Sequence, residues 1–99
     1  MINGINDDCA TRFEAATEIL NTLIALCEHD LSSEPTASAL GQARIDQLHD
    51  RRRALVLMRR ALDPSDLESI ERILKDEGAA VRSRLDEIHS GARNQQPAQ

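Results

Sequence analysis

The chain is nearly devoid of aromatic side chains. Its 99 residues include no Trp and no Tyr, and Phe13 is the one aromatic residue. This scarcity excludes the stacked aromatic surfaces that bind single-stranded nucleic acid, and it argues against an all-β domain, which draws on aromatic and β-branched residues. The core of so small a domain must therefore be aliphatic.

Membrane spans, a signal peptide and a disulfide are also missing from the pattern. No apolar run approaches the roughly 18 residues that a spanning helix needs, and the first eight residues carry neither positive charge nor an apolar stretch. Cys9 and Cys27 would lie about 27 Å apart on one helix, whereas a disulfide needs Cα atoms within about 7 Å. We expect a cytoplasmic protein with free thiols and no membrane insertion.

No group of residues has a spacing typical of catalysis or metal binding. The histidines are His29, His49 and His89, and none has the paired His or Cys spacing of a zinc site. A lone cysteine without a neighbouring base is a weak candidate nucleophile. We therefore expect no enzyme activity, no cofactor and no metal.

Three amphipathic segments predict an all-α fold. In the first, near 8–31, apolar residues recur at steps of three and four from Phe13 to Cys27. The second, near 37–62, and the third, near 64–90, have the same period. Turns containing Pro35 and Pro64 separate them. We expect an antiparallel three-helix bundle in a single domain, 1–90, followed by a disordered tail, 91–99.

Local signals suggest where these helices begin. Asn6 to Asp8 supply cap candidates for the first helix, and Thr11 and Glu14 have the spacing of a capping box. Asp63 is a good N-cap for the third helix, because Pro64 would then take the first helical position.

The short connection at Pro64 predicts that the second and third helices pack as an antiparallel hairpin. In that register Arg52 falls opposite Lys75 and Asp76, within a turn of Glu77, so we expect a structural salt bridge between Arg52 and Asp76 or Glu77. Leu48 would then face Ala79, beside Gly78.

Four consecutive apolar residues, 55–58, point in all directions around the second helix. One neighbouring helix cannot cover them, so we expect an exposed groove on the second and third helices that binds a partner helix or a second copy of the chain. The candidate partner-binding residues are Val56, Leu57, Met58, Ile70, Ile73 and Leu74.

The formal net charge of −5 argues against a general nucleic-acid binder. The charge is uneven, because the segment 37–62 is basic and both flanks are acidic. This pattern is typical of a basic helix packed between acidic ones. An anion site at Arg51 to Arg53 is the alternative.

Residues 61–77 (ALDPSDLESIERILKDE), continuing to Val81 and Leu85, together with 45–56 (IDQLHDRRRALV), resemble flagellar export chaperones of the FliT and FlgN type. The resemblance covers about residues 40–90. It implies a cytoplasmic chaperone or adaptor of type III secretion that shields an amphipathic end of an export substrate.

Two other functions remain open. A homo-oligomeric coiled coil would use the same apolar stripes. The segment 43–48 (ARIDQL) resembles the opening of the first helix of helical chorismate mutases, in which Arg44, Arg51 and Arg52 would supply cations for a dianionic substrate.

Overall fold

The computed structural model describes residues 2–34 and 38–94, with side chains described for 9–34 and 38–90. These residues form three helical rods and contain no strand, so the predicted all-α helical bundle is confirmed. The first two rods are single helices, whereas the third is interrupted by one π-helical turn, η1. The elements are α1 (Ile2–Ser33), α2 (Ala39–Ala61), α3 (Leu67–Arg72), η1 (Ile73–Glu77) and α4 (Gly78–Asn94).

Helix α1 begins earlier than the sequence suggested. The cap candidates from Asn6 to Asp8, and the pair Thr11 and Glu14, lie inside the helix, so the predicted start near residue 8 is wrong. No proline precedes this point to interrupt the helix, and Gly4 costs a helix only about 1 kcal/mol. The start of α2 is better defined, because the Ser38 hydroxyl accepts a hydrogen bond from the Gly41 N–H at 3.0 Å.

The turn into α3 uses both of its aspartates, but not as predicted. Asp66 is the N-cap, and its carboxylate accepts hydrogen bonds from the Ser69 N–H at 3.2 Å and the Ser69 hydroxyl at 2.7 Å. Asp63 instead closes the turn by accepting from the Ser65 N–H at 2.8 Å. The third rod therefore begins after the predicted position, because this side chain stabilises a tight turn as readily as a helix end.

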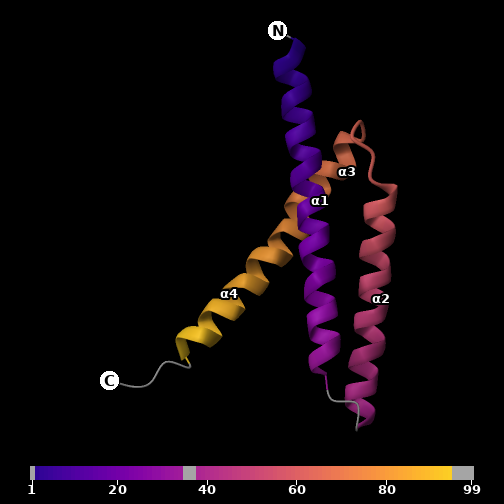
Figure 1. Ribbon diagram of the computed structural model, residues 1–99, viewed down its shortest axis with the longest axis vertical. Helices are drawn as coiled ribbons and strands as arrows, with labels where there is room; N and C mark the ends of the chain where they lie inside the picture. The colour runs from indigo at the N-terminus through magenta and orange to yellow at the C-terminus, as the bar shows by residue number, and fades with distance from the viewer. Residues whose placement is uncertain (1, 35–37, 95–99) are drawn as a thin grey trace.

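Helices α1 and α2 form the antiparallel hairpin of the molecule (Figure 1). Arg52 of α2 bonds Glu28 of α1, and Arg59 bonds Asn21. The residue numbers of the two pairs have the same sum, as a constant antiparallel register requires.

The third rod crosses α1 and does not pack along α2. The expected hairpin of the second and third helices is therefore wrong. Helix α1 is the central element because it supplies most of the buried side chains, so both neighbours gain more by packing on it. The buried apolar residues are Ala16, Leu20, Leu23, Ile24 and Cys27 of α1, Leu48 and Leu55 of α2, and Ile70 and Ile73 of the third rod.

Gly78 lies against α1 where the third rod crosses it. A Cβ atom on this residue would lie 3.4 Å from Cδ1 of Ile19. Its neighbour is therefore on α1, and the expected contact between Leu48 and the small residues around Ala79 is wrong. Beyond this crossing α4 diverges from α1, on the side of α1 away from α2 (Figure 1).

The C-terminal boundary also differs from the expectation. Helix α4 continues to Asn94, so the predicted tail does not begin at residue 91. The rest of that tail, 95–99, lies outside the described residues.

Candidate partner-binding groove

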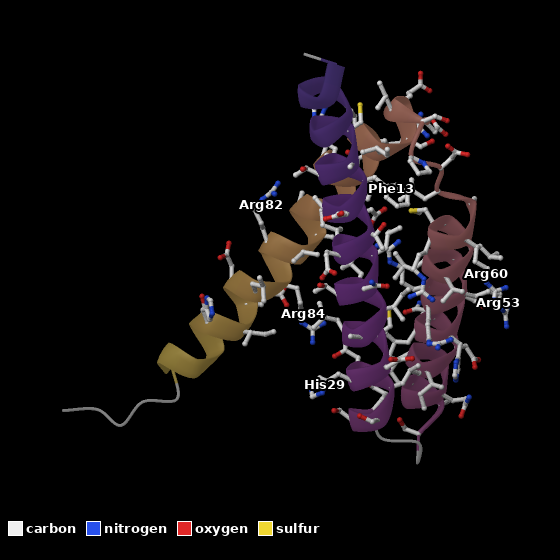
Figure 2. All side chains as sticks on the ribbon, turned by 45° about the horizontal axis from the view of Figure 1, so that its top comes forward. Phe13, His29, Arg53, Arg60, Arg82 and Arg84 are labelled. Atoms are coloured by element: carbon white, nitrogen blue, oxygen red, sulfur yellow. The ribbon has the colours of Figure 1, made fainter. Side chains whose placement is uncertain are left out.

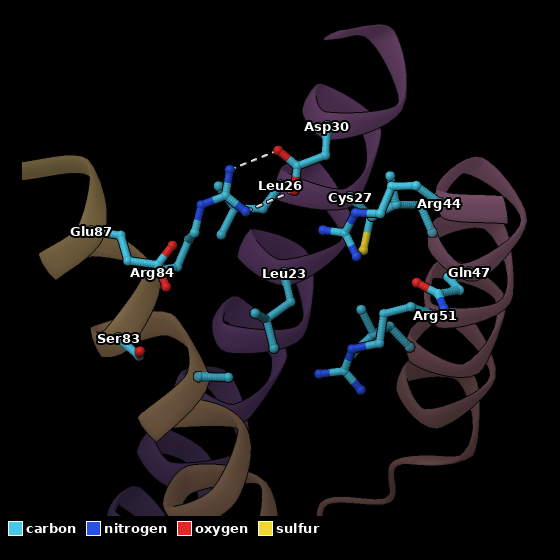
Figure 3. Close-up of a pocket in the computed structure, with 13 residues that line it drawn as sticks. Leu23, Leu26, Cys27, Asp30, Arg44, Gln47, Arg51, Ser83, Arg84 and Glu87 are labelled. Atoms are coloured by element: carbon cyan, nitrogen blue, oxygen red, sulfur yellow. Dashed lines mark hydrogen bonds and ion pairs between the residues drawn. The ribbon is translucent and has the colours of Figure 1, made fainter. Parts of the chain in front are cut away.

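A groove of about 560 Å³ lies where α4 diverges from the α1–α2 hairpin (Figure 3). We call it the three-helix groove. Its floor is apolar and comes from the hairpin, because the inward faces of α1 and α2 meet there while α4 is too far away to cover them. The floor residues are Leu23, Leu26, Cys27, Leu48 and Leu55.

The α2 wall of the groove is polar and basic. Arg44, Gln47 and Arg51 follow one another at steps of three and four, so they lie on one face of α2. Arg51 forms an ion pair with Glu77 at 2.6 Å. Arg44 forms no hydrogen bond or ion pair with any residue that the structure describes, and its guanidinium lies over the groove near Cys27 (Figure 3).

The opposite wall is formed by α4, through Ala80, Ser83, Arg84 and Glu87. The two terminal nitrogens of Arg84 donate to the two carboxylate oxygens of Asp30, at 2.7 and 2.6 Å. This bidentate pair holds α4 to the C-terminal end of α1. The hydrogen bonds from Arg84 lower the pKa of the Asp30 carboxyl, and those same bonds raise the pKa of Arg84.

Cys27 lies in the floor as a buried free thiol. Burial raises its pKa, although Arg51 and Arg44 oppose this shift. A thiol with a raised pKa is a poor nucleophile at neutral pH. Among the described residues, no group of three or more His, Cys, Asp and Glu is arranged to hold a metal ion.

The groove opens toward the end of the hairpin where α1 ends and α2 begins. Two shallower hollows continue it there, and Arg44 lines both. Ile88 of α4 contributes to one and Leu40 of α2 to the other, with 45% and 83% of their surface exposed. The apolar floor is thus followed by two exposed apolar side chains at its mouth.

The six predicted partner-binding residues do not share one surface. Ile70 and Ile73 are core residues, and their placement in an exposed groove is wrong, because the third rod turns this face onto α1. Leu57 is 56% exposed on α2. Val56, Met58 and Leu74 are half-buried against the core. Met58 and Ile73 also border a separate hollow of about 140 Å³.

The predicted salt bridge of Arg52 has the wrong partner. Arg52 pairs with Glu28 of α1 at 2.8 Å, while Glu77 pairs with Arg51 and Asp76 is exposed. Neighbouring residues point about 100° apart on a helix. Arg51 therefore points toward the third rod and reaches Glu77, whereas Arg52 points toward α1 and reaches Glu28.

Sequence reasoning missed the groove itself and the pair that shapes it. Asp30 and Arg84 are separated by 54 positions, and no local pattern links them. Arg44 and Arg51 were named in the sequence only as cations for a dianionic substrate, and Arg51 also as part of an anion site.

The fold and the groove define the chain as an all-α helical bundle with an open, apolar-floored groove. No described helix has the length and apolar character that crossing a bilayer demands. No protein-family model, curated protein or solved structure matches the chain. The resemblance to flagellar export chaperones therefore rests on the sequence pattern alone.

Proposed function

We propose that this protein is a small cytoplasmic chaperone or adaptor that binds an amphipathic helix of a partner protein, such as an export substrate, in the three-helix groove. One observation carries the proposal. The three-helix groove lies open between α2 and α4, its floor is apolar, with Leu26 half-buried and the other floor residues buried, and exposed Leu40 and Ile88 line the two hollows at its mouth. An amphipathic helix laid in such a groove buries its apolar stripe against the floor and leaves its polar face in water.

The length of the groove suits a short helix. The groove and the hollow at its mouth together extend along α2 from Leu40 to Leu55, about 22 Å at the rise of an α-helix. A partner segment of about four turns spans this distance, and its i, i+3, i+4 and i+7 side chains reach the floor.

The enzyme alternative has weaker support. Three arginines line the groove, as a site for a dianion would require, but Arg84 and Arg51 are already paired with carboxylates. A small anion would have to compete with Asp30 and Glu77 for them.

Self-association is a second candidate, favoured by apolar residues away from the groove. Leu57 and Leu85 are 56% and 42% exposed, and neither lines the three-helix groove. If they join two copies, sedimentation will show a dimer that a Leu57→Ser, Leu85→Ser double variant converts to a monomer.

The direct test uses a synthetic amphipathic helix of about 18 residues carrying one Trp among its apolar positions. The chain has no Trp or Tyr, so the fluorescence of the peptide is read without background. We expect a blue shift on binding. We also expect slower alkylation of Cys27 in a Cys9→Ser background, because the bound helix covers the floor.

Two matched phenylalanine variants of α4 provide the control. Ser83→Phe fills the groove from its α4 wall and should abolish the blue shift. Arg82→Phe adds the same ring where Arg82 points away from the hairpin, and should leave binding intact (Figure 2). Equal binding by both variants, or no protection of Cys27, would show that the groove is not the binding site.

A further inference from the structure

The two walls of the three-helix groove differ in charge. The α2 wall presents Arg44 and Arg51, with Gln47 between them and no acid among its lining residues. The α4 wall presents Glu87 and Ser83 beside Arg84, whose charge is balanced by Asp30. The groove therefore has a cationic edge on α2 and a weakly anionic edge on α4.

Arg44 is the cation of this edge that no carboxylate binds directly. Arg51 remains 42% exposed but forms an ion pair with Glu77, whereas Arg44 forms no hydrogen bond or ion pair among the described residues and interacts with Asp30 only through its charge. Its side chain borders the groove and both hollows at the mouth. An unpaired guanidinium beside an apolar floor gains from a carboxylate that arrives with an apolar surface, because the floor excludes water around the pair.

We propose that the three-helix groove selects an amphipathic helix with an acidic edge, which places one carboxylate against Arg44 and a second, seven residues away, where it shares the Arg51 guanidinium with Glu77. Two arginines seven positions apart on α2 are about 10.5 Å apart along its axis, which is two turns of a partner helix. A carboxylate pair at i and i+7 matches this spacing whether the partner runs parallel or antiparallel to α2. A lysine on the other edge of the partner would face Glu87.

This inference rests on the proposed function and adds the chemistry of the partner. The α4 helix of a second copy of the chain fits the groove less well than such a partner helix. Asp86 and Glu87 are adjacent there and lack the two-turn spacing, and position 80 of the same helix is an alanine. The chain as a whole carries a net charge of −5, so attraction of an acidic partner must come from this local edge.

The experiment compares three versions of the Trp-bearing peptide that differ only at the i and i+7 edge positions, which carry Glu, Gln or Lys. We expect the Glu peptide to bind most tightly and to weaken as salt is raised. Arg44→Glu should weaken the Glu peptide about five-fold to ten-fold, within the range of a solvent-accessible charge reversal. The same variant should bind the Lys peptide more tightly than the native chain does.

Arg60→Glu is the matched control. This substitution changes the charge by the same amount on the same helix. Arg60 lies on the outer side of α2, away from the groove (Figure 2). It should leave the order of the three peptides unchanged. An equal loss in Arg44→Glu and Arg60→Glu would trace the effect to net charge and overturn the inference.

The remaining outcomes separate this inference from the proposed function. If all three peptides bind equally and still protect Cys27, the groove binds helices but the acidic edge is wrong. If none binds, the proposed function itself fails. If inorganic phosphate at millimolar concentration displaces the Glu peptide but not the Gln peptide, the arginines form a free-anion site and the inference is overturned.

Discussion

Two leucines of α2 show how little the identity of a residue says about its role. Leu55 is fully buried among α1 and the third rod, whereas Leu57, two positions later, is 56% exposed. Both belong to the same apolar run, and of the two only Leu57 was predicted to bind a partner. Their difference is one of helical rotation, since two residues turn the side chain by about 200°.

This difference predicts unequal effects of the same substitution. Leu55→Ala should lower the free energy of unfolding by about 2–5 kcal/mol, because it leaves a cavity in the core. Leu57→Ala should change it by no more than about 0.5 kcal/mol. Urea unfolding followed by far-ultraviolet circular dichroism measures both, and comparable losses would contradict the assigned burial.

Asp30 ties the stability of the α1–α4 contact to pH. The hydrogen bonds from Arg84 lower the pKa of Asp30 in the folded state. A lowered carboxyl pKa gives stability that is fully present above the ordinary Asp pKa, near 3.9, and is lost as pH falls through the folded value.

The corresponding prediction is a flatter acid profile for Asp30→Asn. The free energy of unfolding of the native chain should fall more steeply below about pH 4 than that of the variant. Glu68→Gln is a suitable control, because Glu68 pairs only with Arg72 on the exposed face of α3. Parallel profiles for the native chain and Asp30→Asn would refute the role of this pair.

At the scale of elements, the third rod differs from the other two in having a π-helical turn between α3 and α4. The π-helical turn from Ile73 to Glu77 keeps Ile73 in the core and brings Glu77 to Arg51. Gly78 follows at once and lies beside Ile19 where the rod crosses α1. The crossing then fixes the divergence of α4, and with it the groove.

Gly78 offers a test of how close this crossing is. Its backbone is helical, and an added Cβ would make an ordinary contact with Ile19. Gly78→Ala should therefore stabilise the fold by about 0.5–1 kcal/mol through helix propensity. Gly78→Val should destabilise it, because the branched side chain would force Ile19 aside. Thermal unfolding of both variants decides, and two stabilising substitutions would mean that α1 lies farther away.

At the scale of the whole molecule, stability is concentrated in α1. Arg84 bonds Asp30 of α1, and beyond Arg84 the apolar side chains Leu85 and Ile88 of α4 are 42% and 45% exposed. Amide exchange should therefore be slow in α1 between Ala16 and Cys27 and faster in α4 after Arg84. Hydrogen exchange read by mass spectrometry measures this, and equal protection of the two segments would contradict it.

Sequence alone determined the class of fold and much of α1. The lack of aromatic residues required an aliphatic core, and the recurrence from Ala16 to Cys27 correctly identified the buried face of α1. Helical periodicity and prolines in the turns are local signals, so they remain readable without knowledge of the partner of each helix. The three-helix order was predictable for the same reason.

Only the tertiary structure decided which helices meet. The third rod packs on α1 rather than on α2. Ile73 is therefore a core residue, and Glu77 forms its ion pair with Arg51 and not with Arg52. The groove follows from that choice and from the pairing of Asp30 with Arg84 across 54 positions. An amphipathic pattern indicates that one face of a helix must be buried, but it does not indicate which element covers that face. Apolar burial is not directional, and the geometry of crossing helices depends on side chains far apart in the chain.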